Sequence, residues 1–105
     1  MDLTDAIRDY VQEKMDMLEK ITQDFEPAVE MRVEVGKTSN RHAKGPYFRA
    51  EMQLSVPGEV FRATEEAEDL YEAVDKVKDQ LRRQIKSYKD RLKDRDQRAV
   101  RPDKE

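Results

Sequence analysis

Four cations at helical spacing in the C-terminal third of the chain are the residues best placed to do chemistry. At 100° per residue, Arg82, Lys86, Lys89 and Lys93 fall within an arc of about 60° on one side of a helix. We call these four residues the ladder. A one-turn repeat of positive charge suits a phosphate backbone, because each contact releases counterions without reading a base. The same pattern also fits the solvated face of an amphipathic helix, and the spacing alone does not separate the two interpretations.

The distribution of charge favours a polyanionic partner for this part of the chain. The 105 residues carry a net charge of −3, but residues 1–75 carry a net of −9 and residues 76–105 a net of +6. Phosphate binding depends on local charge, since surface charges more than about 10 Å apart are screened at ordinary salt. Lys78 adjoins the ladder and adds to this local excess.

Few residues could serve catalysis, so we expect no enzymatic activity. Cysteine is absent, which excludes disulfides, thiolate nucleophiles and zinc-thiolate sites. His42 is the only histidine and lies in a polar stretch, where a surface role is the ordinary expectation. The sequence contains no Gly-rich phosphate loop, no nucleophile elbow and no cluster with metal-ligand spacing. We therefore expect no cofactor, no metal and no small-molecule substrate.

The remaining bulk features indicate a cytoplasmic protein. No apolar run approaches the roughly 20 residues that a membrane span requires. The N-terminus is acidic and lacks the layout of a signal peptide. We therefore expect no membrane partner.

Two helices are predicted to position the cations. Apolar residues at helical spacing predict the first over residues 5–23, with Thr4 as its N-cap. Lys14 lies within its apolar stripe; the interpretation we favour is that its stem covers the core, and the alternative is that its ammonium meets a ligand. Asp69 caps the second, which is predicted to end near Arg95. Its core stripe is Leu70, Val74, Val77, Leu81, Ile85, Tyr88 and Leu92.

Between the helices, alternating apolar residues predict three strands. They cover residues 29–35, 48–56 and 59–64, and a Pro57–Gly58 turn joins the last two into a hairpin. Each strand has one apolar face, so the sheet should be covered on one side only. The sequence thus predicts an α+β fold with a small antiparallel sheet, ordered helix–strand–strand–strand–helix. We expect one domain over residues 1–95 and a disordered charged tail over residues 96–105.

Four segments, in the same order along the chain, resemble the ribosome hibernation-promoting factor family. This family includes ribosome-associated inhibitor A and was formerly described as sigma-54 modulation protein. The segments are residues 3–11, 48–64, 68–75 and 80–93. The resemblance implies two helices packed on one face of a four-stranded sheet. It also implies a translation inhibitor that binds the small ribosomal subunit and its rRNA in the channel used by mRNA and tRNA.

The resemblance also implies which side chains contact RNA. Arg83, Lys89, Arg91 and Lys93 fall where the family is commonly basic, and Lys14 matches a basic position in the first helix. The positions of Gln80 and Ser87 are often basic in relatives, so we expect the patch to be shifted by a turn toward Arg82 and Lys86. Together with the ladder's neighbours, the predicted rRNA-binding residues are Lys14, Lys78, Arg82, Arg83, Lys86, Lys89, Arg91 and Lys93.

Two departures from the family lead to further expectations. Family members begin with a strand before the segment at residues 3–11, and this sequence has no such strand. The strand at residues 29–35 would then be an open edge, which invites weak self-association. The sequence also ends where long-form relatives continue into a dimerisation domain, so we expect a short form.

Two alternatives to the ribosome-binding interpretation stay open. A general double-stranded-RNA-binding module shares the helix–strand–strand–strand–helix order and would bind duplex RNA as tightly as ribosomes. A protein–protein adaptor would use the acidic face of residues 1–75 or the open strand edge.

Overall fold

The computed structural model describes residues 4–23, 30–38 and 47–100, with the backbone alone for Tyr47 and residues 95–100. The elements follow the order α1 (Asp5–Gln23), β1 (Glu30–Thr38), β2 (Tyr47–Val56), β3 (Glu59–Ala67) and α2 (Leu70–Val100). The predicted helix–strand–strand–strand–helix order is confirmed. His42 lies outside the described residues.

The three strands form an antiparallel sheet in the order β1–β2–β3. Pro57 and Gly58 form the predicted turn between β2 and β3, and Gly58 has a φ of 94°, a conformation that glycine adopts without strain. Among the described residues, β1 pairs with β2 alone, so β1 is an edge of this sheet. Its inward residues Met31 and Val33 are only half-buried.

Several ends differ from the predictions. β1 continues to Thr38, and β3 continues to Ala67, so both are longer than their alternating apolar runs. α2 continues to Val100, beyond the predicted end near Arg95, so the first part of the predicted tail is helical. No glycine or proline stops the helix before Pro102, which explains why the sequence placed its end poorly. Residues 101–105 lie outside the described part of the chain.

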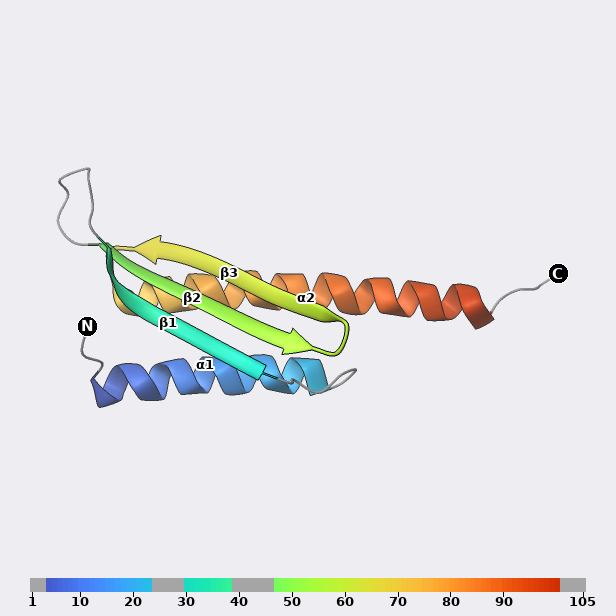
Figure 1. Ribbon diagram of the computed structural model, residues 1–105, viewed down its shortest axis with the longest axis horizontal. Helices are drawn as coiled ribbons and strands as arrows, with labels where there is room; N and C mark the ends of the chain where they lie inside the picture. The colour runs from blue at the N-terminus through green and yellow to red at the C-terminus, as the bar shows by residue number, and fades with distance from the viewer. Residues whose placement is uncertain (1–3, 24–29, 39–46, 101–105) are drawn as a thin grey trace.

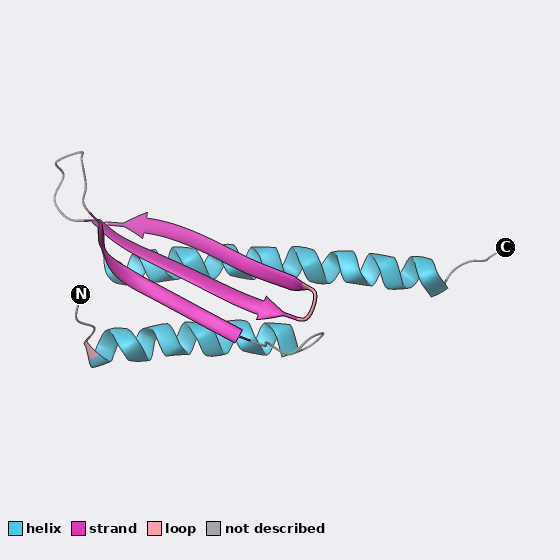
Figure 2. Cartoon of the chain, viewed as in Figure 1, coloured by secondary structure: helices cyan, strands magenta, loops and turns pink. Residues whose placement is uncertain are grey.

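Both helices lie on one face of the sheet, side by side and running in the same direction (Figures 1 and 2). The core lies between this helical layer and the sheet. Its fully buried side chains include Leu18 of α1, Met52 and Leu54 of β2, and Val77 and Leu81 of α2. At about 46 Å, α2 is longer than the strands, and its C-terminal part extends beyond the sheet (Figure 1).

Each helix begins where a side-chain cap was predicted. The hydroxyl oxygen of Thr4 accepts a hydrogen bond from the backbone N–H of Ile7 at 3.2 Å. A carboxylate oxygen of Asp69 accepts one from the N–H of Tyr71, also at 3.2 Å. These caps fix the first turn of each helix and therefore the direction in which every later side chain projects.

Candidate nucleic-acid interface

The ladder lies on the flank of α2 that faces α1. Tyr71 and Asp75 occupy the same flank, about three and two turns before Arg82, and both contact Tyr10 of α1. The rings of Tyr10 and Tyr71 meet edge to face, with their centres 4.8 Å apart. Of the ladder residues, Arg82, Lys86 and Lys93 are exposed and Lys89 is half-buried. The arrangement gives a row of cations about 16 Å long, beside a buried stripe that holds the helix against the sheet.

Lys14 points into the contact between the two helices. Its side chain is 13% exposed, and its Nζ lies 3.9 Å from a carboxylate oxygen of Asp75 and 4.6 Å from the centre of the Tyr10 ring. An ammonium held this way gains both an ion pair and a cation–π contact. The structure therefore favours the packing interpretation of Lys14, and its contact with RNA stays a prediction.

Tyr10 and Asp75 link the helices through a short hydrogen bond. The phenolic O–H of Tyr10 donates to Asp75 at 2.7 Å. This hydrogen bond to a carboxylate, with a smaller contribution from burial, raises the pKa of Tyr10 to about 12. The hydroxyl therefore stays protonated at neutral pH, and Asp75 holds both the Tyr10 hydroxyl and the Lys14 ammonium.

Lys78 is also largely covered, at 14% exposure, and its Nζ donates to Asp79 at 2.8 Å. That hydrogen bond, together with the charges of Arg83 and Arg82, lowers the pKa of the Asp79 carboxyl below its usual range. Asp79 is therefore an anion that lies between cations on both sides. The sequence pattern suggested that Lys78 simply extends the ladder, but its charge is locally compensated.

Arg83 and Arg91 lie on the opposite flank of α2 from the ladder. Counted from Leu70, the ladder covers about 100–160° around the helix, whereas Arg83 and Arg91 lie at about 220° and 300°. That flank faces β3: the Arg91 guanidinium lies 4.0 Å from the Glu59 carboxylate and 5.8 Å from the centre of the Tyr88 ring. The predicted RNA-binding residues thus form two groups rather than one.

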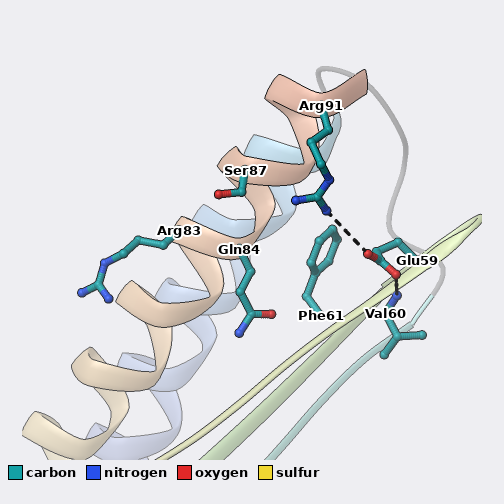
Figure 3. Close-up of a pocket in the computed structure, with 7 residues that line it drawn as sticks. All are labelled: Glu59, Val60, Phe61, Arg83, Gln84, Ser87 and Arg91. Carbon is teal, nitrogen blue, oxygen red and sulfur yellow. Dashed lines mark hydrogen bonds and ion pairs between the residues drawn. The ribbon is translucent and has the colours of Figure 1, made fainter. Parts of the chain in front are cut away.

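A hollow of about 310 Å³ opens between this flank and the β2–β3 hairpin. Figure 3 shows Arg91 reaching across it toward Glu59, while Arg83 and Ser87 project outward from α2. The hollow is lined by Glu59, Val60, Phe61, Arg83, Gln84, Ser87 and Arg91. Because the Arg91 side chain is 66% exposed, its guanidinium is accessible to a ligand at the mouth.

Two glutamines fasten the same flank to β3, which the sequence did not predict. The Gln84 side chain accepts from the backbone N–H of Arg62 at 3.3 Å and donates to its carbonyl at 2.9 Å. Gln80 donates to Glu65 at 3.0 Å. In the sequence, the one sign of this contact with β3 was that Gln80 and Gln84 are one helical turn apart on the same side of α2. Gln84 thus holds α2 through the backbone of β3 and Gln80 through a carboxylate, and neither position uses a cation.

The solvent-facing side of the sheet is neutralised by its own ion pairs. The Glu51 carboxylate lies 2.9 Å from Nε of Arg62 and 2.8 Å from Nη2 of Arg49. The hydrogen bonds from these arginines, that from Arg62 first, hold the pKa of Glu51 below its usual range. This face therefore offers less uncompensated positive charge than α2 does.

In the described ranges, no three His, Cys, Asp or Glu residues come together in a way that could hold a metal ion. Nor does any described helix combine the length and the apolarity needed to cross a membrane.

Comparison with known proteins gives one family. Residues 1–93 match the family described as sigma 54 modulation protein / S30EA ribosomal protein. The chain is 35% identical over 91 residues to the ribosome hibernation promotion factor of Deinococcus radiodurans, covering 87% of this chain and 46% of that one. It is 36% identical over 90 residues to that of Staphylococcus aureus (strain COL), covering 86% and 44%. The chain thus spans less than half the length of these relatives.

Two solved structures share the fold. The N-terminal domain of Thermus thermophilus Protein Y superposes with a TM-score of 0.62 at 34% identity, covering 84% of this chain and 88% of that one. A ribosomal subunit interface protein from Coxiella burnetii also superposes with a TM-score of 0.62, covering 85% and 88%, at 20% identity, which supports the fold alone.

Proposed function

Because this chain belongs to the sigma 54 modulation protein / S30EA ribosomal protein family, we propose that it is a non-enzymatic ribosome-binding protein that inhibits translation and promotes ribosome hibernation. Two relatives that it resembles over most of its length are named ribosome hibernation promotion factors. In our proposal the chain binds the rRNA of the small subunit in the mRNA–tRNA channel. It acts in the cytoplasm, where ribosomes are, and needs no cofactor.

The observation that carries the proposal is the ladder. Its cations project from one flank of a helix whose apolar stripe is buried from Leu70 to Ile85, so the packing of α2 fixes where they point. Such a row can neutralise several phosphates of one backbone without rearranging the fold. Arg83 and Arg91 add charge on the other flank. Lys14 and Lys78 add less positive charge to the proposed contact, because their ammonium groups are already paired with Asp75 and Asp79.

The test is cosedimentation of the purified chain with small ribosomal subunits across a salt series. A variant with Arg82, Lys86, Lys89 and Lys93 changed to Gln removes four positive charges from the exposed flank. We expect the slope of log K against log salt to become shallower by about 3, since each phosphate contact contributes about 0.7 to 0.9.

A control variant carries the same change of charge elsewhere. Arg8, Lys20, Arg32 and Lys37 are exposed and lie outside α2, so their replacement by Gln should leave the slope near that of the wild type. Equal binding by the ladder variant and the wild type would refute the ladder as the contact. Duplex RNA that competes as well as subunits would indicate a general RNA-binding module instead, and salt-insensitive binding of a protein would indicate an adaptor.

A further inference from the structure

The two flanks of α2 are separated by a line of acidic residues. Glu72, Asp79 and Asp90 lie at about 180–200° around the helix, on the side farthest from the core. We call these three residues the acidic crest. Glu72 and Asp90 are exposed, and the side chain of Asp79 is 47% exposed. Glu72 lies about 15 Å before Arg82 along the helix axis and pairs with Lys76 at 3.8 Å, so Asp79 and Asp90 are the crest carboxylates that lie close to the two groups of cations.

Neighbouring cations favour the charged form of Asp79 in the acidic crest. Lys78, Arg82 and Arg83 together hold the Asp79 carboxyl in its charged form. Arg82 belongs to the ladder, and Arg83 belongs to the other flank, so Asp79 lies between the two groups of cations. The repulsion between the crest and a phosphate favours backbone positions on either side of it over a position on top of it.

The flank opposite the ladder has the features of a second contact. We call Arg83, Ser87 and Arg91 the hairpin flank, because they follow one another at one-turn intervals beside the β2–β3 hairpin. Arg83 and Arg91 are about 12 Å apart along the helix axis, with the Ser87 hydroxyl between them. Arg83 and Ser87 project outward and Arg91 crosses the hollow (Figure 3). Two phosphates of one backbone could accept hydrogen bonds here, one from Arg91 at the mouth of the hollow and one from Arg83 further along the helix.

The main opposing charge on this flank is Glu59. Its carboxylate lies 4.0 Å from the Arg91 guanidinium, which is a long and largely exposed contact. An exposed pair of this kind contributes little to folding, so a phosphate can replace the carboxylate at small cost. Asp94 is exposed on the same side of α2, one turn beyond Arg91, and limits the favourable stretch at that end.

From this geometry we propose that α2 contacts two separate segments of RNA backbone, with the ladder on one, the hairpin flank on the other, and the acidic crest facing the space between them. This inference rests on the proposed function, since it assigns two contacts where that function needs only one. The partner it fits is a place where two RNA strands run on either side of a helix, as across a groove or a junction. A single extended strand would use one flank only.

Three variants with the same change of charge test this proposal. The ladder pair is Arg82→Gln/Lys86→Gln, the hairpin-flank pair is Arg83→Gln/Arg91→Gln, and the control pair is Arg8→Gln/Lys37→Gln on α1 and β1. Each is measured with small ribosomal subunits across the salt series, after circular dichroism has shown unchanged helix content. We expect each α2 pair to make the slope shallower by about 1.5 and the combined variant to make it shallower by about 3.

The outcomes separate this inference from the proposed function. If the ladder pair loses slope and the hairpin-flank pair matches the control, the second contact is refuted while the proposed function stands. If neither α2 pair differs from the control, both fail. A short single-stranded oligonucleotide gives a further check. The slope of log K against log salt for its binding should become shallower in one of the two α2 pair variants but not in both.

A fourth variant tests the hollow by a gain rather than a loss. Glu59→Gln removes the carboxylate that faces Arg91 and keeps a side chain of similar size. If a phosphate occupies the mouth of the hollow, subunits should bind several-fold more tightly, and the Arg91→Gln background should abolish the gain. Unchanged or weaker binding by Glu59→Gln would refute a phosphate at this position.

Discussion

At the scale of single residues, the contact between the helices depends on a small polar cluster. The Asp75 carboxylate accepts a hydrogen bond from the Tyr10 hydroxyl at 2.7 Å and lies 3.9 Å from the Lys14 ammonium. The same ammonium lies over the Tyr10 ring. The Tyr10 hydroxyl and the Lys14 ammonium thus share one carboxylate oxygen of Asp75, so both groups have a partner at the margin of the core. The cluster fixes α1 against the flank of α2 that carries the ladder.

Replacing Tyr10 with Phe tests the cluster through its pH dependence. At pH 7 the variant should lose about 1–2 kcal/mol of unfolding free energy, because one hydrogen bond to a carboxylate is lost. The pKa of Tyr10 is about 12 in the folded chain and 10.0 without perturbation. Between these values the unfolded chain releases the proton and the folded chain keeps it, so the stability from this hydrogen bond is complete below pH 10 and falls as pH rises toward 12.

The measurement is urea unfolding of both proteins at pH 7 and at intervals between pH 9 and 12. The difference between wild type and Tyr10→Phe should shrink across the upper part of that range. A difference that stays constant with pH would mean that the hydroxyl is not held by Asp75. Tyrosinate absorbance gives an independent reading, since a tyrosine that titrates near pH 12 should be present in the wild type and missing from Tyr10→Phe.

At the scale of elements, periodicity predicted where the helices and strands lie but not how they are fastened together. The core stripe of α2 is buried as predicted from Leu70 to Ile85, because apolar spacing fixes which side of a helix faces inward. Tyr88 and Leu92 are only half-buried, and Tyr88 packs edge to face on Phe61 beside the β2–β3 turn. The hydrogen bonds of Gln84 to Arg62 depend on the register between two elements far apart in sequence, and no local pattern encodes that register.

Gln84→Ala tests how much this fastening contributes. The substitution removes two hydrogen bonds to the backbone of β3 and leaves the Arg62 N–H and carbonyl to find other partners. We expect a loss of about 1–2 kcal/mol in unfolding free energy, measured with urea. The matched variant Gln80→Ala removes one side-chain contact to Glu65 and should lose less. Equal losses would argue that helix propensity or packing, rather than the pair of backbone contacts, explains the effect.

At the scale of the whole molecule, the sequence predicted the fold class and the region of the candidate site but not its division. Net charge by segment pointed to α2, yet it treated Arg83 and Arg91 as members of one patch with the ladder. Angular positions around the helix already separate them, but only the packed β3 shows that Arg91 faces Glu59. Likewise, the sequence could not decide between two roles for Lys14, because the choice depends on Asp75, which lies on another helix.

The parallel direction of the two helices has a consequence for the protein when no RNA is bound. Peptide dipoles add along each helix to leave partial positive charge at its N-terminus and partial negative charge at its C-terminus. Since α1 and α2 run the same way, their N-termini lie at the same end of the molecule, while the C-terminus of α2 extends beyond that of α1 (Figure 1). Asp5 and Glu72 lie in the first turns, Lys20 lies in the last turn of α1, and an excess of cations is found in the later part of α2. Side-chain charges therefore oppose the summed dipoles of both helices.

It follows that the ladder should also support the free fold. Lys93, two turns before Val100, is the ladder residue nearest to the C-terminus of α2, so the four-residue Gln variant should unfold only slightly more easily than the wild type at low salt, by at most a few tenths of a kcal/mol in total. Raising the salt should reduce that difference, because screening weakens charge–dipole attraction. Thermal unfolding at two ionic strengths measures it, and a difference independent of salt would contradict the argument. If the difference does fall with salt, the cations proposed to bind RNA also stabilise α2 in the free protein.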